Sequence, residues 1–225
     1  MQYFSSLLHN YEEWIFFCGP DGLQNTYINL FGDPFIQNTV QEEMIQQPLM
    51  QLPFSNDEAW SFTGGPHGGW GNGSAWAALD FAPPGTELGC FTSDSWVTAV
   101  ADGIIIYESN GLVIHDLDGD GHSQTGWVVI YQHIASRDRI KVSSIVQAGD
   151  PIGHPSCEGG ISSGTHVHIA RRYNGEWISA DDQMPFIMDG WESRGTGRMY
   201  DGYLIREGQV VEAWADRREE NQISR

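Results

Sequence analysis

The sequence predicts a mainly β protein: an antiparallel, sandwich-like sheet domain preceded by a short helical N-terminal segment. The 27 Gly and 10 Pro residues of the 225-residue chain favour frequent turns over long helices. Short runs rich in β-branched and aromatic residues recur along the chain, and turn sequences such as Ser109-Asn110-Gly111 separate them. The predicted strands are residues 77–82, 97–101, 103–107, 113–115, 127–131 and 166–170.

Residues 1–47 have a different character from the rest of the chain. Two short amphipathic helices are expected around a turn at residues 18–22, followed by a polar connector. So short a segment buries little surface by itself, and we expect it either to dock on the main domain or to be the tail of a missing upstream module. Residues 48–225 then form the β-rich domain, with a core at about residues 49–180 and a C-terminal extension.

The acidic composition restricts the partners of the chain. Its 30 Asp and Glu residues against 11 Lys and Arg give a net charge of −19, so we expect no nucleic-acid partner, because phosphate binding needs a basic surface. No apolar run is long enough to span a bilayer. The first residues lack a basic region and carry Glu12 and Glu13, so they are not a signal peptide, which we expect upstream of this chain.

The stretch GTHVHIAR, residues 164–171, contains His166 and His168 two positions apart. In a strand both side chains point to one face, while Val167 and Ile169 point to the other. Imidazole is a common metal ligand and a common general base, so one histidine is suited to bind a metal and the other to move a proton. A pair of surface histidines is the alternative.

Further metal ligands are predicted upstream. Asp80 lies inside an apolar run, where a carboxylate is costly to bury unless it is paired or binds a metal. His67 lies in the Gly-rich segment 64–69, where the backbone can approach a site closely. With His168 they form a His/Asp/His set, and catalytic zinc sites use three protein ligands. The alternatives are a salt-bridge or turn carboxylate and a loop histidine. His133 ends another strand-like run; taken alone, it is more simply a packed or surface residue.

The order of these elements resembles the lysostaphin-type zinc metalloendopeptidases, which cleave peptide cross-links of bacterial cell walls, and above all their staphylolysin-type members. The resemblance covers roughly residues 49 to 180. It is carried by His67 and Asp80 thirteen positions apart, by His133, and by the His-Val-His strand. Further similar stretches are residues 50–54, 146–153, 157–160 and 173–175.

The resemblance implies a role for each site residue. His67, Asp80 and His168 would hold one Zn²⁺ per chain, and His133 and His166 would be catalytic without binding the metal. Which of these two acts as the base stays open. Tyr200 stands where staphylolysin-type enzymes carry a site tyrosine, but its surroundings depart from the family, and an ordinary core tyrosine is the alternative.

The function that the resemblance implies is hydrolysis of peptide bonds in bacterial cell-wall peptidoglycan, with glycyl bonds of stem or cross-link peptides as the family-based expectation. Peptidoglycan or Gly-rich peptides would be the partners, outside the cell or in its envelope. A non-catalytic relative that binds cell-wall peptides or regulates another hydrolase is the alternative. A β-sandwich carbohydrate-binding module is a third reading, but it would leave the paired histidines and Asp80 unexplained.

Three cysteines allow at most one intramolecular disulfide. In staphylolysin-type enzymes the cysteine matching Cys157 is disulfide-bonded, although its partner lies elsewhere in the sequence. We therefore predict a Cys90–Cys157 bridge with Cys18 left free, and two separately buried thiols are the alternative. A bridge would imply an oxidising compartment.

The run from Asp116 to Gly121 resembles the first half of a calcium loop, with Asp116, Asp118 and Asp120 at ligand spacing. The twelfth position is Trp127 rather than a bidentate Glu, so a tight acidic turn is the competing reading, and we favour it over Ca²⁺. The histidines in or beside turns, namely His115, His122 and His154, are expected to face solvent.

Overall fold

The computed structural model describes residues 45–71 and 73–225. Residues 1–44 of the predicted helical N-terminal segment lie outside the described residues. Within the described part, all the regular structure is β-strand except for one 3-10 turn at Glu219–Asn221. The strand pairings found there are all antiparallel, which confirms the predicted mainly β, antiparallel class.

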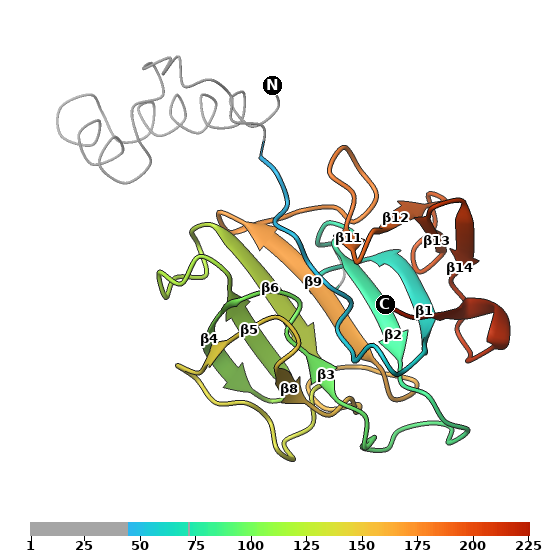
Figure 1. The fold of residues 1–225 in the computed structure, drawn as a ribbon, viewed down its shortest axis with the longest axis horizontal. Helices are drawn as coiled ribbons and strands as arrows, with labels where there is room; N and C mark the ends of the chain where they lie inside the picture. The colour runs from blue at the N-terminus through green and yellow to red at the C-terminus, as the bar shows by residue number, and fades with distance from the viewer. Residues whose placement is uncertain (1–44, 72) are drawn as a thin grey trace. The chain divides into compact units, whose positions relative to one another are not determined.

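The main sheet is formed by strands from both ends of the described chain. They are β1 (Trp60–His67), β2 (Ala78–Ala82), β4 (Gly103–Ser109), β5 (Leu112–Asp116), β6 (Trp127–Gln132), β7 (Ile145–Val146), β9 (Val167–Tyr173), β10 (Glu176–Trp177) and β15 (Gln222–Ile223). Their order is β15-β1-β2-β9-β6-β5-β4-β7, and β10 pairs with β9. The part of this order from β1 to β4 can be followed in Figure 1. The late strand β9 therefore lies in the centre, between the earlier strands β2 and β6.

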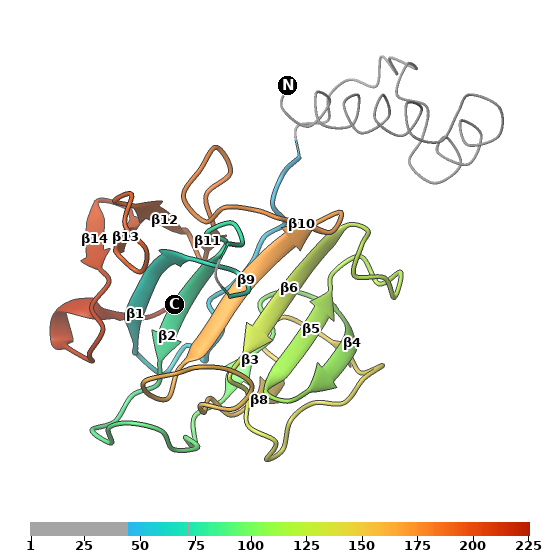
Figure 2. The ribbon, with the colours of Figure 1, turned by 180° about the vertical axis from the view of Figure 1, so that it is seen from behind.

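Two smaller sheets complete the described part. One pairs β3 (Val97–Thr98) with β8 (Pro151–Gly153), and the other has the order β11-β12-β13-β14. The strands of the second are β11 (Ile187–Met188), β12 (Trp191–Gly195), β13 (Gly202–Arg206) and β14 (Gln209–Glu212). Figure 2 shows this four-stranded sheet beside the β1 edge of the main sheet, away from β4 and β5.

One face of the main sheet covers the hydrophobic core. Alternate residues of β2 and β9, such as Leu79, Phe81 and Ile169, point into it and are fully buried. The segment before β1 packs on the same core, where the ring of Phe54 stacks on that of Trp60 with centroids 4.9 Å apart. Burial of these apolar side chains is what holds the central strands in register.

The opposite face of the same strands carries small and polar residues. Ala78 of β2 and Ala170 of β9 are buried there, and Trp177 packs against them. Farther along this face, Asp80 lies directly opposite His168 in the β2–β9 pairing. The two-residue period thus separates an apolar face for stability from a second face for function.

The strand β1 was not predicted from the sequence. Gly64, Gly65 and Pro66 interrupt its apolar pattern, and the pairing of β1 with β2 shifts register on both sides of Gly64. A Cβ at Gly64 would lie 2.7 Å from Oδ2 of Asp80. Gly64 is therefore needed to let the β1 backbone pass beside the Asp80 carboxylate.

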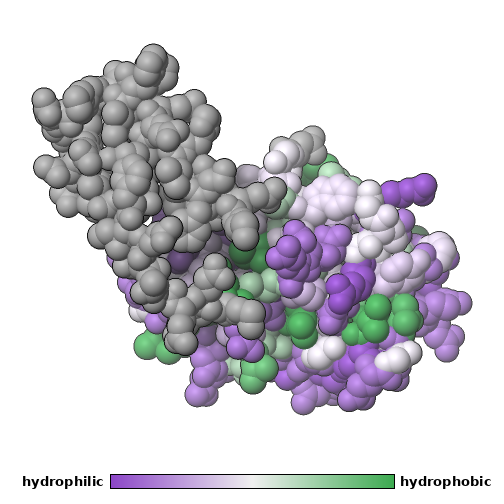
Figure 3. All heavy atoms as spheres, turned by 90° about the horizontal axis from the view of Figure 1, so that it is seen from above, coloured by the Kyte–Doolittle hydropathy of each residue, from purple (hydrophilic) through white to green (hydrophobic). Residues whose placement is uncertain are grey.

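The surface fits the acidic, polar composition. Figure 3 shows one face of the molecule, where hydrophilic side chains predominate around separate hydrophobic patches. Among the described residues, no helix has the length and apolar character needed to cross a membrane.

Candidate metal centre

Three ligand-type side chains converge on the second face of the main sheet. Nε2 of His67 and Nδ1 of His168 lie 3.0 Å apart, and each lies 3.2 Å from Oδ1 of Asp80. The three residues come from the end of β1, from β2 and from β9, and all are buried. The structure therefore brings together the three residues that the sequence predicts as a set.

The spacing of these three atoms fits zinc. Ligands bound tetrahedrally at about 2.0 Å are separated from one another by about 3.3 Å, close to the distances of 3.0 and 3.2 Å found here. Oδ1 of Asp80 is buried and has no hydrogen-bond partner in the described part of the chain. A buried carboxylate oxygen in that state is costly unless a cation satisfies it.

Backbone carbonyls set the tautomers of the two ligand histidines. Nδ1 of His67 donates to the carbonyl of Gly65 at 2.8 Å, and Nε2 of His168 donates to that of Gly69 at 3.2 Å. The other nitrogen of each ring therefore keeps its lone pair and faces Asp80. A Cβ at Gly69 would lie 2.5 Å from the ring of Trp177, so glycine is required where the chain presents this carbonyl.

The electrostatics keep the carboxylate ionised. Burial alone would raise the pKa of Asp80, but the charges of His67 and His166 outweigh it and hold that pKa well below its usual range. Burial alone would lower the pKa of His67, but the carboxylate of Asp80 outweighs it and raises that pKa. The triad is thus an anionic oxygen between two imidazole nitrogens, a donor set typical of zinc.

His133 and His166 lie together at one side of the triad. Their ring centroids are 4.5 Å apart, and Nε2 of His166 lies 3.6 Å from Oδ1 of Asp80. Each donates its Nδ1 hydrogen to a carbonyl, His133 to Glu158 at 3.0 Å and His166 to Gly164 at 2.8 Å. Burial, with a further contribution from His166, lowers the pKa of His133 to about 4.

The position of His133 follows from the sheet. It comes directly after Gln132, the last residue of β6, and Gln132 pairs with His168 across the β6–β9 ladder. Asp80, His168 and Gln132 are thus paired in line across β2, β9 and β6, and His133 follows Gln132 at the end of this line. His166 reaches the same region from just before β9, through an isolated bridge between its backbone and Ser156.

Tyr200 lies at this site rather than in the core. Its ring stacks on that of His67, with centroids 4.2 Å apart, and the residue is 52% exposed. Backbone hydrogen bonds from Tyr200 to Pro66 and from Gly65 to Tyr200 tie it to the end of β1. Burial, with a contribution from Asp80, raises the pKa of its hydroxyl.

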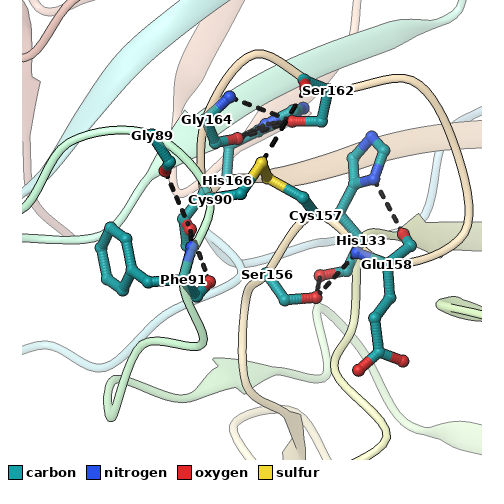
Figure 4. Close-up of a disulfide and its surroundings, with 11 residues drawn as sticks. Gly89, Cys90, Phe91, His133, Ser156, Cys157, Glu158, Ser162, Gly164 and His166 are labelled. Carbon is teal, nitrogen blue, oxygen red and sulfur yellow. Dashed lines mark hydrogen bonds between the residues drawn. A yellow bond between two sulfur atoms is a disulfide. The ribbon is translucent and has the colours of Figure 1, made fainter.

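The predicted disulfide is confirmed. Cys90 and Cys157 are bonded, with Cα atoms 5.6 Å apart, while Cys18 lies outside the described residues. Figure 4 shows the bridge with His133, Glu158 and His166 around it. The bridge joins the loop after β2 to the loop that supplies the carbonyls for both uncoordinated histidines.

The acidic turn uses its own carboxylates. Asp116 accepts hydrogen bonds from the backbone N–H groups of Asp118 and Gly121, at 3.3 and 2.8 Å. Asp118 and Asp120 accept in the same way from the backbone two residues on. Although the three carboxylates lie close enough for a metal, this pattern of an Asx turn supports the tight-turn reading, and nothing in it supports Ca²⁺.

Two histidines expected to face solvent are buried, so that expectation was wrong for them. His115 is 0% exposed within β5, where Nδ1 lies 3.3 Å from the Tyr131 hydroxyl. His154 is 5% exposed, and its ring packs on Trp96 with centroids 4.0 Å apart. Neighbouring turns in the sequence do not reveal that strands and aromatic rings cover these positions. His122 is exposed, as expected.

Sequence reasoning missed the groups that hold the site histidines in place. The acceptors are the carbonyls of Gly65, Gly69, Glu158 and Gly164. A backbone carbonyl leaves no trace in the residue type, so the one available signal was the run of glycines around His67, which permits close backbone approach.

Comparisons with known proteins agree on one family. The profile of Peptidase family M23 matches residues 82–180. The beta-lytic metalloendopeptidase of Achromobacter lyticus is 26% identical over 176 residues, which cover 72% of this chain and 43% of that protein. Protease LasA of Pseudomonas aeruginosa is 27% identical over 141 residues, covering 58% of this chain and 31% of LasA. The chain thus spans less than half the length of these two relatives.

Two further proteins match over most of their length. The beta-lytic metalloendopeptidase of Lysobacter enzymogenes is 27% identical over 173 residues, 72% of this chain and 90% of that protein. The solved structure of pseudoalterin, described as a novel M23 metalloprotease from the deep sea, superposes with a TM-score of 0.62 and 27% identity, covering 80% of this chain and 99% of that one. The profile match over residues 82–180 and the shared fold make this chain similar to the metalloproteases of peptidase family M23.

Proposed function

We propose that this protein is a zinc-dependent endopeptidase that hydrolyses peptide bonds in bacterial cell-wall peptidoglycan. The observation that carries the proposal is the triangle of His67 Nε2, His168 Nδ1 and Asp80 Oδ1, a buried oxygen without a hydrogen-bond partner in the described part of the chain. Two further histidines, His133 and His166, lie beside this triangle. The names of the curated relatives, metalloendopeptidase and protease, support the same reaction class.

His67, Asp80 and His168 would hold the ion. Two neutral imidazoles and one carboxylate leave the site with a net positive charge when a divalent cation is bound. Zinc in such a site lowers the pKa of water and polarises a carbonyl group. The carbonyls of Gly65 and Gly69 keep the two imidazoles turned toward the ion, because each holds the hydrogen of the other ring nitrogen.

His133 and His166 would move the protons of the reaction. Because both donate Nδ1–H to a carbonyl, both present an Nε2 lone pair that can accept a proton from the attacking water. One of them then returns a proton to the leaving amine, and in its charged form it stabilises the oxyanion. Tyr200, whose ring stacks on that of His67, would donate a hydrogen bond from its hydroxyl to a bound substrate.

We further propose glycyl bonds of stem or cross-link peptides as the substrate, on the strength of the resemblance to staphylolysin-type enzymes. The Cys90–Cys157 disulfide supports a location outside the cell or in its envelope, because disulfides persist in oxidising compartments. Residues 48–225 would be the peptidase domain.

The test combines metal analysis with peptide hydrolysis. The purified protein is expected to contain about one zinc per chain by mass spectrometry and to cleave pentaglycine, with alanyl peptides as the comparison. His67→Ala should lose both metal and cleavage, while His122→Ala, which changes an exposed histidine outside the site, should keep both. Zinc without hydrolysis of any peptide would indicate a binding protein, and absence of metal from an unchelated sample would overturn the proposal.

A further inference from the structure

The backbone of His133 has an unusual conformation for a residue that carries a functional ring. Its φ is 64°, in the left-handed region that non-glycine residues seldom adopt. Such a conformation persists only where neighbouring groups hold it. The groups that contact the backbone and ring of His133 come from one short segment, residues 156–160, which contains the disulfide-bonded Cys157.

Two residues of that segment fix the backbone and the ring of His133. The carbonyl of His133 accepts hydrogen bonds from the Ser156 N–H at 2.7 Å and from the Ser156 hydroxyl at 2.9 Å. The ring donates Nδ1–H to the carbonyl of Glu158 at 3.0 Å (Figure 4). A Cβ at Gly160 would lie 3.3 Å from Cε1 of His133, so the segment also packs closely on the ring.

The side chain of Glu158 holds the chain just after His133. Its Oε1 accepts hydrogen bonds from the backbone N–H and the hydroxyl of Ser136, at 2.8 and 3.1 Å. Its Oε2 lies 3.6 Å from Nη1 of Arg139. Glu158 therefore contacts this part of the chain in two ways. Its backbone carbonyl accepts the hydrogen bond from the His133 ring, and its carboxylate accepts hydrogen bonds from Ser136 in the turn that follows.

The other neighbours of Glu158 leave its carbonyl little freedom. A Cβ at Gly111 would lie 2.4 Å from that carbonyl oxygen, and a Cβ at Gly159 would lie 2.0 Å from the carbonyl oxygen of Asn110. The turn between β4 and β5 is thus pressed against the segment. On its other side Cys157 anchors the segment to Cys90.

We propose that Glu158 is a positioning residue for His133: its carboxylate, by clamping Ser136, holds its own carbonyl on Nδ1 and so keeps the Nε2 lone pair of His133 directed at the reaction site. This inference rests on the proposed peptidase function and deepens it. Glu158 touches no metal ligand in the triad and is not itself catalytic. The tautomer of His133 then depends on the side chain of Glu158, which lies 25 positions away in the sequence.

The test compares Glu158→Ala with a matched control, Glu108→Ala. Glu108 is also a carboxylate bound to Arg139, at 3.0 Å, but it lies on β4 and has no hydrogen bond to the His133 segment. Glu158→Ala should lower kcat on the order of 10- to 100-fold while zinc content stays at the parent level. KM should change by about twofold or less, because the ring acts on the reacting atoms rather than on binding. Glu108→Ala should keep the parent kcat.

A conservative variant separates positioning from folding. Glu158→Gln keeps an oxygen that can accept from the Ser136 N–H, so it should recover most of the kcat that Glu158→Ala loses. If Glu158→Ala does not fold, Ser136→Ala serves instead, because it removes one of the two hydrogen bonds to the carboxylate and should give a smaller loss of kcat. Parent kcat in Glu158→Ala, equal losses in Glu158→Ala and Glu108→Ala, or a loss that tracks zinc content would each overturn the proposal.

A spectroscopic readout keeps this test distinct from that of the function itself. In ¹⁵N NMR of the zinc-loaded protein, His133 should be a pure Nδ1–H tautomer in the parent and in Glu108→Ala, and a mixture in Glu158→Ala. If the parent cleaves no peptide but the tautomer responds in this way, the proposed function fails and the positioning role stands. If the tautomer is unchanged in Glu158→Ala, the positioning role fails whatever the activity.

Discussion

His166 and His168 stand two positions apart on one side of the chain, but their rings have different partners. His168 donates Nε2–H to Gly69 and turns Nδ1 to Asp80 and His67, whereas His166 donates Nδ1–H to Gly164 and keeps Nε2 at the edge of the triad. A backbone carbonyl binds Nε2 of His168 but Nδ1 of His166, so the two rings present different nitrogens to the site. This difference suits one histidine to bind a metal and the other to move a proton.

This difference predicts opposite metal content in two single variants. His168→Ala should lose both zinc and activity, because it removes one of three ligands. His166→Ala should keep zinc and lose turnover on the order of a hundredfold or more, as expected for a general acid–base group. Mass spectrometry for zinc and pentaglycine hydrolysis measure the two effects. A metal-free His166→Ala protein, or one with parent turnover, would contradict the assignment.

His115 predicts a stability that falls in acid. Burial lowers its pKa from the ordinary 6.5 to about 4, with Asp116 and Asp102 acting weakly in the opposite direction. His115 therefore becomes protonated below about pH 6.5 in the unfolded chain but only below about pH 4 in the folded chain. The stability contributed by this difference is fully present above pH 6.5 and is lost as the pH falls from 6.5 to about 4. The loss from this one group is about 3 kcal/mol.

Urea unfolding at pH 7 and pH 4.5 measures this loss. His115→Gln, whose side chain does not titrate, should show a difference between the two pH values smaller than that of the parent by about 2 kcal/mol. Contributions from other groups, including any metal lost in acid, act on both proteins and cancel in the comparison. Equal pH dependence in the two proteins would show that burial of His115 does not govern the acid response.

At the scale of loops and strands, the Cys90–Cys157 bridge is the main covalent constraint. It closes a loop with a sequence separation of 67 residues, which contains β3 to β8. Constraining the unfolded chain over such a loop stabilises the fold by about 4 kcal/mol in the chain-entropy description. The double variant Cys90→Ser/Cys157→Ser should lose a stability of this order in urea unfolding, while Cys18→Ser should keep it. A loss below about 1 kcal/mol would refute the estimate.

The sequence was sufficient for elements whose pattern is local. β2, β5, β6 and β9 follow from apolar runs bounded by turns, and the triad follows from residue types placed on or beside such runs. β1 could not be predicted, because its glycines serve the approach to Asp80 and so break the strand pattern. The burial of His115 and the clamp of Glu158 on Ser136 depend on contacts between distant segments, which no local pattern encodes.

At the scale of the whole molecule, the metal is expected to add to the stability of the folded chain. A ligand that binds the folded state alone stabilises it by about 2.7 kcal/mol when its concentration is 100 times its Kd. Chelation should therefore lower Tm by roughly 5 to 10 °C for a domain of this size. Calorimetry with and without chelator measures the shift, and His168→Ala should show none. An unchanged Tm in parent protein shown to be metal-free would contradict the prediction.

The ligands of this centre are distant in the chain, and His67 and His168 are 101 residues apart. They meet only when β1, β2 and β9 have paired, and a slip of one residue between β2 and β9 would turn His168 toward the apolar core. Pairing of strands so far apart in the sequence is slow, because the entropy cost of closing the loop comes before the stabilising contacts form. We therefore expect uptake of the proposed zinc ion to be a late step in folding, and its rate during refolding should report when the central strands have reached their correct register.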